Sequence, residues 1–503
     1  MDEQPSIFRP GDNCWRVETA DRLALLIDND EAFDALKSIL LGAKRSIWIL
    51  AWVFDPLTRL DPDRVKRSRD PLRADRIGLL LRRQAALNPN LDVRVLTWAM
   101  PFPIAAAQLF GPQRGAAFFA GSRVKYHLDH TLPASACHHQ KVVVVDGQVA
   151  LLSGGDIGVD RWDTINHLDS DPRRRLPTGR RYPARHEVAT LVDGPAAEAL
   201  GDLFKARWKN ATGETVASPG KPEMSPWPDF LLPDVRKVGL AISRTQPVWK
   251  GQPEINETML LHLASIRAAK RLIYLENQYL TSPIIVEALA ERLAEPDGPE
   301  VVTVGPARSP SYFDQITMDS ARTAAINRLH GVDVHHRFSA FSARTAKGGM
   351  IIVHSKVAIM DDWMLRLGSA NLNNRSIGLD TECDVAFEAH NDRDRTVVRA
   401  FMARLVGHFL GVTTDRFLEV YEREGGLAAT INTLDDRQGA PRRLAPVPVR
   451  PLSGFQKFVA DWNLGDAIAP DDAWRPWGRR QRLKQDLARL MLPPPDLPEH
   501  LRR

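Results

Sequence analysis

The sequence contains an internal duplication, and this duplication constrains the fold more than any other feature. The segments AKRSIWILAW and AKRLIYLENQ begin at Ala43 and Ala269, and further along FKARW matches FMARL. Between these anchors stand HHQKVVVVD at 138–146 and VHSKVAIMD at 353–361. Because the matching segments keep the same order, the sequence predicts two homologous halves of about 200 residues each.

Each half begins with a helix that is followed by a buried strand. In AFDALKSILLGAKR the apolar residues recur at helical spacing, and SIWILAWVF is a β-rich run of strand length. ETMLLHLASIRAAKR followed by LIYLENQYL repeats that order in the second half. Helices that alternate with mostly buried strands predict an α/β layered architecture.

Proline and glycine mark the boundary between the halves. GETVASPGKPEMSPWPDFLLPD, which starts at Gly213, is dense in Pro, Gly and Ser and has no periodicity, so it indicates a linker. In the C-terminal part, WGRRQRLKQDLARLML fits an amphipathic helix, and packing of this tail along the two halves is favoured over membrane binding. The predicted organisation is a first half at 1–212, a linker at 213–240, a second half at 241–425 and a Pro- and Arg-rich tail at 426–503.

Length and composition place the chain among globular proteins. Its 503 residues, 44% of them hydrophobic, suffice for two domains with ordinary cores. The net charge of +5 is small for this length and does not imply a nucleic-acid partner. Three widely spaced cysteines form neither a disulfide framework nor a zinc pattern, which favours a reducing compartment. No secretory signal or membrane-spanning run is found, so a cytoplasmic or peripheral membrane location is expected.

The two repeated motifs place a histidine and a lysine on the same face of a strand. Side chains alternate along a strand, so His139 and Lys141 point to the same side, as do His354 and Lys356. A single His-x-Lys on a strand is usually no more than an exposed polar face. Two copies at matched positions of a duplicated chain indicate a functional pair instead.

Each motif ends in an aspartate that is expected to anchor a turn. Asp146 precedes Gly147 after a run of valines, and Asp361 precedes Asp362 in the matching place. Asp-Gly after such a run is a strong turn signal. The two aspartates therefore belong to the catalytic motif, but they are not expected to reach the reacting atom.

Downstream of each motif come a turn of small residues and then a glutamate. The turns are SGGD, which ends at Asp156, and GSAN, which contains Ser369 and ends at Asn371. Such a turn lets backbone amides and one polar side chain approach a site closely. The aspartate of the first turn carries a charge that the asparagine of the second lacks, and it is expected to orient a basic side chain. Glu187 and Glu382 each precede a β-like run, and a glutamate bonded to one imidazole nitrogen fixes the histidine tautomer.

These segments together resemble the phospholipase D superfamily, over most of residues 34–411. GGDIGVDRWDT resembles the Gly-Gly…Gly-Arg-Trp-Asp segment of that family, LIYLENQYL its Ile-Glu-Asn-Gln-Tyr-Phe block, and GSANLNNRS the stretch after its second motif. Val159 and Asp160 stand where the family often has a glycine, which bears on the local turn. Two triplets are expected to bind substrate, with strand-end polarity and the locking of a loop as their respective alternatives: Glu276, Asn277 and Gln278, and Arg161, Trp162 and Asp163.

The resemblance implies an α/β fold of two homologous halves, each a mixed β-sheet flanked by helices, packed around a shared active site. It also implies a phosphodiesterase that uses no metal and no cofactor. One histidine attacks phosphorus to give a phosphohistidine; the other protonates the leaving alcohol and then deprotonates the incoming water or alcohol. The usual family order makes His139 the nucleophile and His354 the acid/base, although the near two-fold symmetry leaves that assignment reversible. Lys141, Lys356 and Asn371 are expected to surround the phosphoryl group.

Several functions fit this resemblance. The leading one is a phospholipase D that hydrolyses the distal phosphodiester of glycerophospholipids to phosphatidic acid, or passes the phosphatidyl group to an alcohol. Its rival is a cardiolipin synthase, which transfers the same intermediate to the glycerol of another lipid. A nuclease is less favoured because the chain carries both motifs and little net charge, and a lipid-binding protein with a dead site is disfavoured because both copies keep their histidine and lysine. The expected partners are a phospholipid substrate and a peripheral membrane surface, with no nucleic acid, and the chain is expected to be a monomer.

Overall fold

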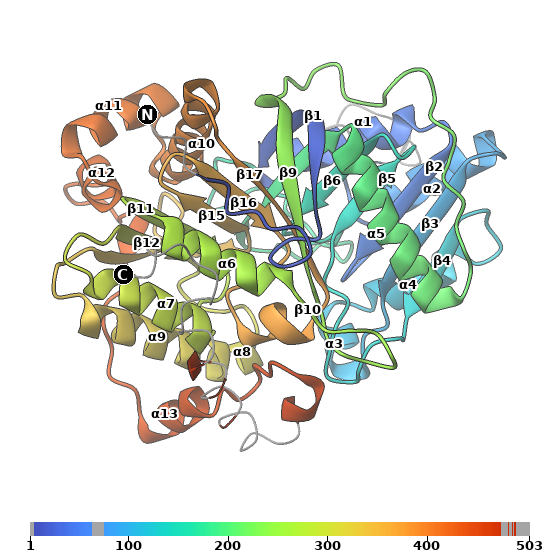
Figure 1. Cartoon of the computed structure of the whole chain (residues 1–503). Coiled ribbons are helices and arrows are strands. Elements are labelled where there is room, and N and C mark those ends of the chain that lie inside the picture. Colours follow the sequence, from blue (N-terminus) through green and yellow to red (C-terminus); the bar gives the residue numbers. More distant parts are fainter. Residues whose placement is uncertain (1–4, 63–74, 474–480, 482–484, 486, 489–503) are drawn as a thin grey trace.

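The computed structural model describes residues 5–62, 75–473, 481, 485, 487 and 488. It shows one large mixed sheet with helices packed on it (Figure 1). The predicted α/β class, with mixed sheets flanked by helices, is confirmed. The predicted helix at 477–492 lies mostly outside the described residues.

The first half contains eight described strands and five described helices. They are β1 (Arg16–Ile27), α1 (Asp28–Gly42), β2 (Ser46–Ala51), α2 (Ile77–Leu87), β3 (Asp92–Trp98), α3 (Phe102–Ala107), α4 (Gly111–Phe119), β4 (Lys125–Asp129), β5 (Val142–Val145), β6 (Val149–Ser153), β7 (Ala184–His186), β8 (Val188–Asp193) and α5 (Pro195–Thr212).

The second half repeats this succession. Its elements are β9 (Val235–Gln246), β10 (Ile255–Asn256), α6 (Glu257–Ala268), β11 (Leu272–Asn277), α7 (Pro283–Ala294), β12 (Glu300–Gly305), α8 (Tyr312–Ile316), α9 (Met318–Val332), β13 (Phe338–Ala343), β14 (Ile351–Val353), β15 (Lys356–Met360), β16 (Met364–Gly368), a π-helical turn (Arg375–Leu379), β17 (Glu382–Glu388), α10 (Asp392–Leu410) and α11 (Thr414–Glu424). The tail adds α12 (Leu427–Leu434), β18 (Leu444–Pro446), α13 (Gly454–Asp461) and a 3-10 turn (Pro470–Ala473).

The two halves contribute mirror-image strand orders to a 16-stranded sheet. The order is β18-β13-β12-β11-β15-β16-β17-β9-β1-β8-β6-β5-β2-β3-β4, with β10 beside β9. Strands β2, β3 and β4 run parallel, as do β11, β12 and β13. The long strands β1 and β9 pair in antiparallel fashion at the centre, from Arg16↔Ile242 to Leu23↔Val235, and this seam joins the halves.

This topology gathers both motifs at one edge of the sheet. β5 runs antiparallel to β2, and Leu50 at the end of β2 faces Val142 at the start of β5. In the second half Asn277 at the end of β11 faces Lys356 at the start of β15. The residues just before β5 and β15 therefore lie beside the carboxyl ends of parallel strands, where α/β sheets usually bind ligands.

In each half one helix follows the last strand, and these two helices, α5 and α10, end in the same way. The helix α5 is capped by Gly213 and α10 by Gly411, and both glycines have positive φ, at +77° and +70°. Glycine adopts this left-handed conformation without a steric penalty, which makes it the usual helix terminator. Side chains of α5 and α10 share one continuous hydrophobic core with strands of both halves, including Trp48, Phe204 and Phe401.

The linker and the tail are both packed onto the halves. Residues 213–234 are irregular, and β9 begins at Val235, inside the segment assigned to the linker from the sequence. Trp227 of the linker is buried in the core of the first half. In the tail, β18 adds an antiparallel edge to β13, and Ile468 packs into the core of the second half.

Candidate active site

The histidines of the two motifs are held by backbone pairing between the halves. The backbone N–H of His139 donates to the carbonyl of Thr381 over 3.0 Å, and that of His354 donates to the carbonyl of His186 over 2.9 Å. The segment before His354 forms β14, which pairs in parallel with β7 of the first half. Each motif therefore enters the site beside the chain that carries the glutamate of the other half.

The imidazoles are paired with these glutamates in a crossed arrangement. His139 Nδ1 lies 2.9 Å from Glu382 Oε2, and His354 Nδ1 lies 3.0 Å from Glu187 Oε2. Both histidine side chains are largely buried, with 13% and 11% of their surface exposed. Because Nδ1 is engaged in each ring, Nε2 is the nitrogen left for chemistry. The sequence indicated two supporting glutamates, but not that each would serve the opposite half.

The two glutamates have different electrostatic surroundings. Burial raises the pKa of Glu382 to about 8, although Lys141 and the hydroxyl of Ser369 oppose that rise. Burial acts in the same direction on Glu187, but His354 and Arg185 outweigh it and hold the pKa of Glu187 well below its usual value. Arg185 Nε donates to Glu187 Oε1 over 2.7 Å. The site is therefore symmetric in geometry and asymmetric in charge.

The two motif lysines lie buried behind the histidines. Lys141 Nζ donates to the carbonyl of His139 over 2.7 Å, and Lys356 Nζ donates to the carbonyl of His354. Burial, together with Lys141 and Lys356, lowers the pKa of His139 well below its usual value. Burial likewise lowers the pKa of His354, although Glu187 opposes it. Burial thus disfavours the protonated form of both rings, and only at His354 does an anionic glutamate, Glu187, offset this effect strongly.

The turns after the two motifs differ at their last residue, which is Asp156 in the first half and Asn371 in the second. Asp156 Oδ1 accepts from the backbone N–H groups of Trp52 and Val53, at 3.1 and 3.0 Å, and Oδ2 lies 3.7 Å from Lys141 Nζ. Asn371 is buried, and its Oδ1 makes no hydrogen bond to any described residue. The aspartate is thus occupied with structure and a lysine, whereas the asparagine has an unused polar atom beside the site.

The glycines of the first turn permit close contact with side chains of the site. A Cβ on Gly154 would lie 3.0 Å from Lys356 Cδ, and one on Gly155 would lie 2.6 Å from the carboxyl carbon of Glu187. A side chain at either position would therefore force its neighbour to move. Trp52, which sequence analysis did not select, places its ring edge-on to His139 with centroids 6.2 Å apart.

The two motif aspartates lie at the far ends of their strands, away from the histidines. Asp146 accepts hydrogen bonds from the backbone N–H groups of residues 44–46, and Asp361 accepts them from those of residues 270–272. Both have positive φ, at 56° and 54°. They fasten the turn after β5 or β15 to the start of β2 or β11, and they do not approach the reacting centre.

The first expected substrate-binding triplet splits between structure and site. Glu276 is fully buried and accepts from Tyr274, from Ser355 and from a nitrogen of His186, so its oxygens are occupied. Asn277 Oδ1 accepts from the backbone N–H of Tyr279 and, over 3.3 Å, from that of Leu372. Gln278 donates to the hydroxyl of Tyr279. These bonds favour the structural alternative for Glu276 and place Asn277 beside the Asn371 loop.

The second triplet is also engaged within the protein. Asp163 accepts from Arg174 over 2.9 Å and from the backbone of Arg185, and Trp162 stacks beneath the guanidinium of Arg173. These contacts favour the locking of a loop over substrate contact for Trp162 and Asp163. Arg161 pairs with the adjacent Asp160, and its buried Nε makes no hydrogen bond to a described residue.

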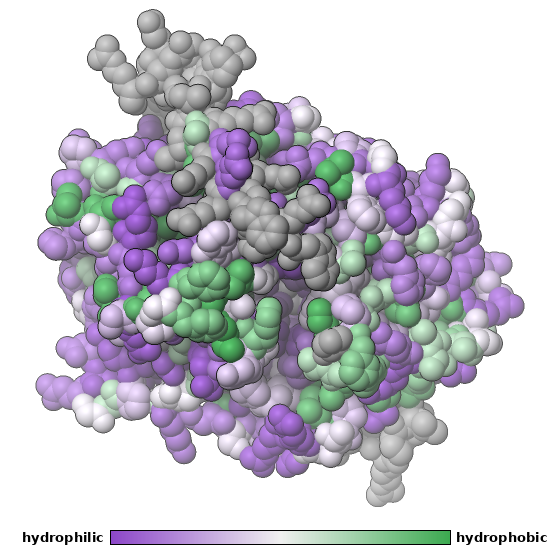
Figure 2. Space-filling view, turned by 90° about the horizontal axis from the view of Figure 1, so that it is seen from below, coloured by the Kyte–Doolittle hydropathy of each residue, from purple (hydrophilic) through white to green (hydrophobic). Residues whose placement is uncertain are grey.

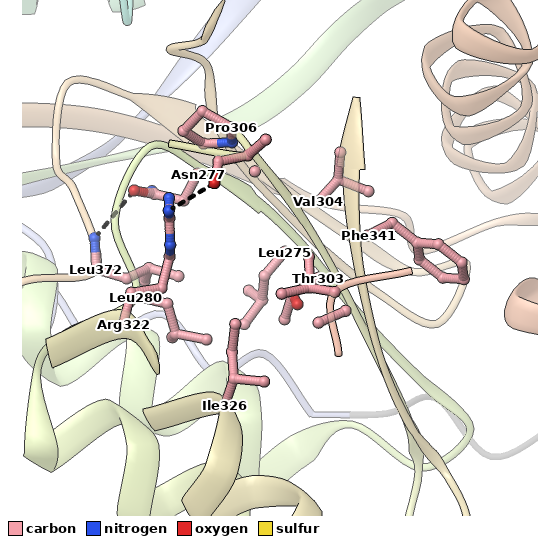
Figure 3. Close-up of a pocket in the computed structure, with 14 residues that line it drawn as sticks. Leu275, Asn277, Leu280, Thr303, Val304, Pro306, Arg322, Ile326, Phe341 and Leu372 are labelled. Carbon is pink, nitrogen blue, oxygen red and sulfur yellow. Dashed lines mark hydrogen bonds between the residues drawn. The ribbon is translucent and has the colours of Figure 1, made fainter. Parts of the chain in front are cut away.

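An apolar cavity lies next to this site (Figure 3). It sits at the carboxyl ends of β11, β12 and β13, and both Asn277 and Leu372, the residue after Asn371, line it. Most of its wall is aliphatic or aromatic, whereas Arg322 contributes a half-buried guanidinium. A cavity of this kind can hold an apolar group attached to a bound phosphate.

The lysine of the second motif predicts a pH limit on activity. Burial, with Lys141 and Arg185, lowers the pKa of Lys356 to about 7, so this lysine loses its charge as the pH rises above neutrality. We expect kcat/KM, which reports the free enzyme, to fall on the alkaline side of pH 7. A p-nitrophenyl phosphodiester distinguishes the loss of the Lys356 charge from the loss of a general acid's proton, since both reduce the rate at alkaline pH. Its leaving group needs no proton, so only the loss of the Lys356 charge should affect this substrate. A flat alkaline profile with that substrate would contradict the role given to Lys356.

Comparison with known proteins points to one superfamily. The family model described as "Cardiolipin synthase, PLD-like domain" matches residues 263–404. Phospholipase D A of Dictyostelium discoideum is 24% identical over 453 residues, which cover 74% of this chain and 33% of that protein. Phospholipase D alpha 4 of Arabidopsis thaliana is 21% identical, over 75% of this chain and 62% of that protein. Cardiolipin synthase A of Pseudomonas putida (strain GB-1) is 27% identical, over 49% of this chain and 43% of that protein.

Among solved structures, phosphatidylserine synthase of Haemophilus influenzae Rd KW20 shares the fold. Its TM-score is 0.50 at 13% sequence identity, over 83% of this chain and 96% of that one. The chain spans between a third and just under two thirds of the three curated relatives named above. Relatives from both phospholipases D and cardiolipin synthases thus match a duplicated chain whose two motifs meet across one interface, and these similarities support the phospholipase D superfamily for this chain.

Proposed function

We propose that the chain is a phospholipase D that hydrolyses the distal phosphodiester of glycerophospholipids to phosphatidic acid and an alcohol. The observation that carries this proposal is the crossed pair of His–Glu hydrogen bonds, 2.9 and 3.0 Å long, which joins the two motifs into one site. Each pair leaves one imidazole nitrogen free, and two buried lysines supply positive charge beside it. Such a set suits a phosphate diester and covalent catalysis.

The proposed reaction proceeds in two displacements at phosphorus. His139 Nε2 attacks, the bond from phosphorus to the head-group oxygen breaks, and His354 donates a proton to that oxygen as it leaves. Neutral His354 then takes a proton from water, the hydroxide oxygen attacks phosphorus, and the phosphorus–nitrogen bond breaks to release phosphatidic acid and restore His139. Lys141, Lys356 and Asn371 stabilise the charge that grows on the phosphoryl oxygens, where the loss of one donor typically costs about 3 kcal/mol in barrier.

The charge asymmetry of the glutamates supports this order of roles. An anionic Glu187, with its pKa held low by His354 and Arg185, stabilises the proton that His354 must carry as acid. Burial raises the pKa of Glu382 to about 8, so Glu382 gives His139 less anionic support. A neutral ring is what a nucleophile requires. We therefore keep His139 as nucleophile and His354 as acid/base.

Transfer to a lipid alcohol is the second candidate. Cardiolipin synthases are among the relatives, and the apolar cavity beside Asn277 and Leu372 provides room for part of an acceptor. The chemistry differs only in the last step, where an alcohol replaces water. A nuclease is less favoured because the net charge of +5 offers no strong field for a phosphate backbone.

One assay separates these functions. The full chain is incubated with vesicles of labelled phosphatidylcholine, with vesicles of phosphatidylglycerol, and with plasmid DNA. Phosphatidic acid and free choline are expected from the first. Cardiolipin from the second, without phosphatidic acid from either, would favour the synthase, and cleavage of the plasmid alone would overturn both lipid functions.

We infer that the protein approaches a membrane with the edge that carries the site. The helix α3 follows β3 and α8 follows β12, both at the carboxyl ends of parallel strands. Exposed apolar side chains occur on both, with Phe102 75% and Phe313 62% exposed. The two helices lie at the bottom of the molecule in Figure 1, and Figure 2 shows apolar groups on both sides of a hollow on that face. None of the described helices is long and apolar enough to cross a membrane.

Replacement of this rim is expected to weaken activity on vesicles only. Phe102 and Phe110 lie with ring centroids 6.2 Å apart, and each would insert an exposed ring into the lipid interface. Serine at both positions should raise the vesicle concentration needed for half-maximal rate by roughly tenfold per ring. Activity on a soluble p-nitrophenyl phosphodiester should stay unchanged. Phe230→Ser, in the linker, removes an equally exposed ring and is the matched control; equal loss from it would contradict the inference.

A further inference from the structure

Four side chains that the proposed reaction does not use converge in a second buried cluster. Asp28 begins α1, His167 follows Trp162 on the loop after β6, His186 ends β7, and His408 lies in α10 of the second half. One ligand atom from each residue can be chosen so that all four lie within 4.8 Å of one another. The first three residues are buried and His408 is partly exposed. Of the described residues, only these form such a group.

The outer nitrogen of each imidazole already has an acceptor. His167 Nδ1 lies 3.1 Å from Asp163 Oδ2, His186 Nε2 lies 2.7 Å from Glu276 Oε1, and His408 Nδ1 lies 2.5 Å from the carbonyl oxygen of Leu405. A histidine that donates its outer N–H to a carboxylate or carbonyl is the usual second shell of a metal ligand. This pattern leaves the lone pair of the inner nitrogen directed into the cluster.

Three distances between inner atoms are close to those between ligands of one metal ion, within a group whose chosen ligand atoms all lie within 4.8 Å of one another. His167 Nε2 lies 3.3 Å from His408 Nε2, His167 Nε2 lies 3.3 Å from Asp28 Oδ2, and His186 Nδ1 lies 2.9 Å from Asp28 Oδ1. Tetrahedral zinc with bonds of about 2.05 Å has ligand edges of about 3.3 Å. Asp28 Oδ2 makes no hydrogen bond to a described residue, although it is buried. Inward imidazole lone pairs and this carboxylate oxygen repel one another unless a proton or a cation lies between them.

We propose that Asp28, His167, His186 and His408 bind one Zn²⁺ ion. Three imidazoles and a carboxylate suit a borderline cation such as zinc, whereas calcium and magnesium prefer sites built from oxygen alone. Four protein ligands close the coordination shell, so the ion is structural and the phosphodiester chemistry stays free of metal. This revises the expectation of a metal-free protein without changing the reaction.

The ion would fasten elements that support the active site. His186 is followed by Glu187, which holds His354, and Glu276 bonds both His186 and Ser355 next to His354. His408 belongs to the second half, whereas the other three ligands belong to the first. Zinc at this position therefore joins the halves and keeps β7 in register with β14.

Metal content of the intact chain tests the proposal. The full protein, purified from cells grown with added zinc and dialysed against metal-free buffer, is expected to hold about one zinc per chain. Cobalt in its place should give the intense visible bands of a tetrahedral site. His167→Asn and His408→Ala should each lose most of the zinc and lower the melting temperature by about 5 °C or more.

Two controls keep these outcomes specific. His335 is exposed and makes no hydrogen bond in the described part, so His335→Ala should keep its zinc. His139→Ala, which removes the nucleophile, should also keep its zinc, because the two sites share no ligand. If the wild-type protein holds no zinc and shows no cobalt bands, the proposal is overturned. The cluster would then be held by hydrogen bonds alone, with a protonated His186 between Asp28 and Glu276. Full zinc in both ligand variants would overturn it as well.

Discussion

His139→Ala is expected to abolish the covalent intermediate, whereas His354→Ala is expected to trap it. In the proposed reaction only His139 bonds to phosphorus, and His354 is needed to activate water for the second displacement. A substrate that carries radiolabel in its phosphate and a p-nitrophenyl leaving group forms the intermediate without an acid. Label should therefore stay on the His354→Ala protein and be absent from His139→Ala, and each variant should lose about 10⁴-fold or more in turnover.

The neighbouring histidine is the matched control for this experiment. His138 precedes His139, but it is fully buried and its Nδ1 lies 3.2 Å from Asp129 Oδ2. His138→Ala should still form and discharge the intermediate. Label on His139→Ala but not on His354→Ala would exchange the two roles. Absence of label from both variants, with lipid turnover retained in either, would rule out the covalent route.

Much of the fold follows from the duplication alone. The repeated order of helix and strand predicted two similar α/β units, and the mirror-image strand orders around β1 and β9 show that repetition in space. The seam itself was not predictable, because β9 begins in a segment whose prolines and glycines indicated only a linker. Strand pairing between segments more than 200 residues apart depends on tertiary packing, which local sequence patterns do not report.

The candidate site shows the same division between local and long-range information. Spacing from each histidine was enough to select Asn371, Asp156 and the motif aspartates, because these positions depend on short turns within one half. The crossed His–Glu pairs depend on how the halves face each other, and nothing within one half specifies that contact. The zinc cluster was missed for the same reason, since its ligands have no local spacing and run from Asp28 to His408.

The crossed pairing gives the second large prediction, which is that a glutamate change in one half disables the histidine of the other. Glu382→Gln should behave like His139→Ala and take up no label, although Glu382 lies in the second half. Glu187→Gln should behave like His354→Ala and retain label on the protein. Glutamine can hold the ring in the wrong tautomer, and at position 187 it also removes a negative charge. The loss of such a partner typically reduces turnover about 10⁴-fold.

Glu254→Gln is the matched control, because Glu254 is exposed and distant in sequence from both motifs. It should leave label and turnover unchanged. If Glu187→Gln prevented labelling and Glu382→Gln trapped it, each glutamate would serve the histidine of its own half, contrary to the contacts at 2.9 and 3.0 Å. The double change Glu382→Gln with His139→Ala should be no worse than His139→Ala alone, since residues that act as one unit are not additive. An additional loss in that double variant would show that Glu382 acts on the reaction by a route other than His139.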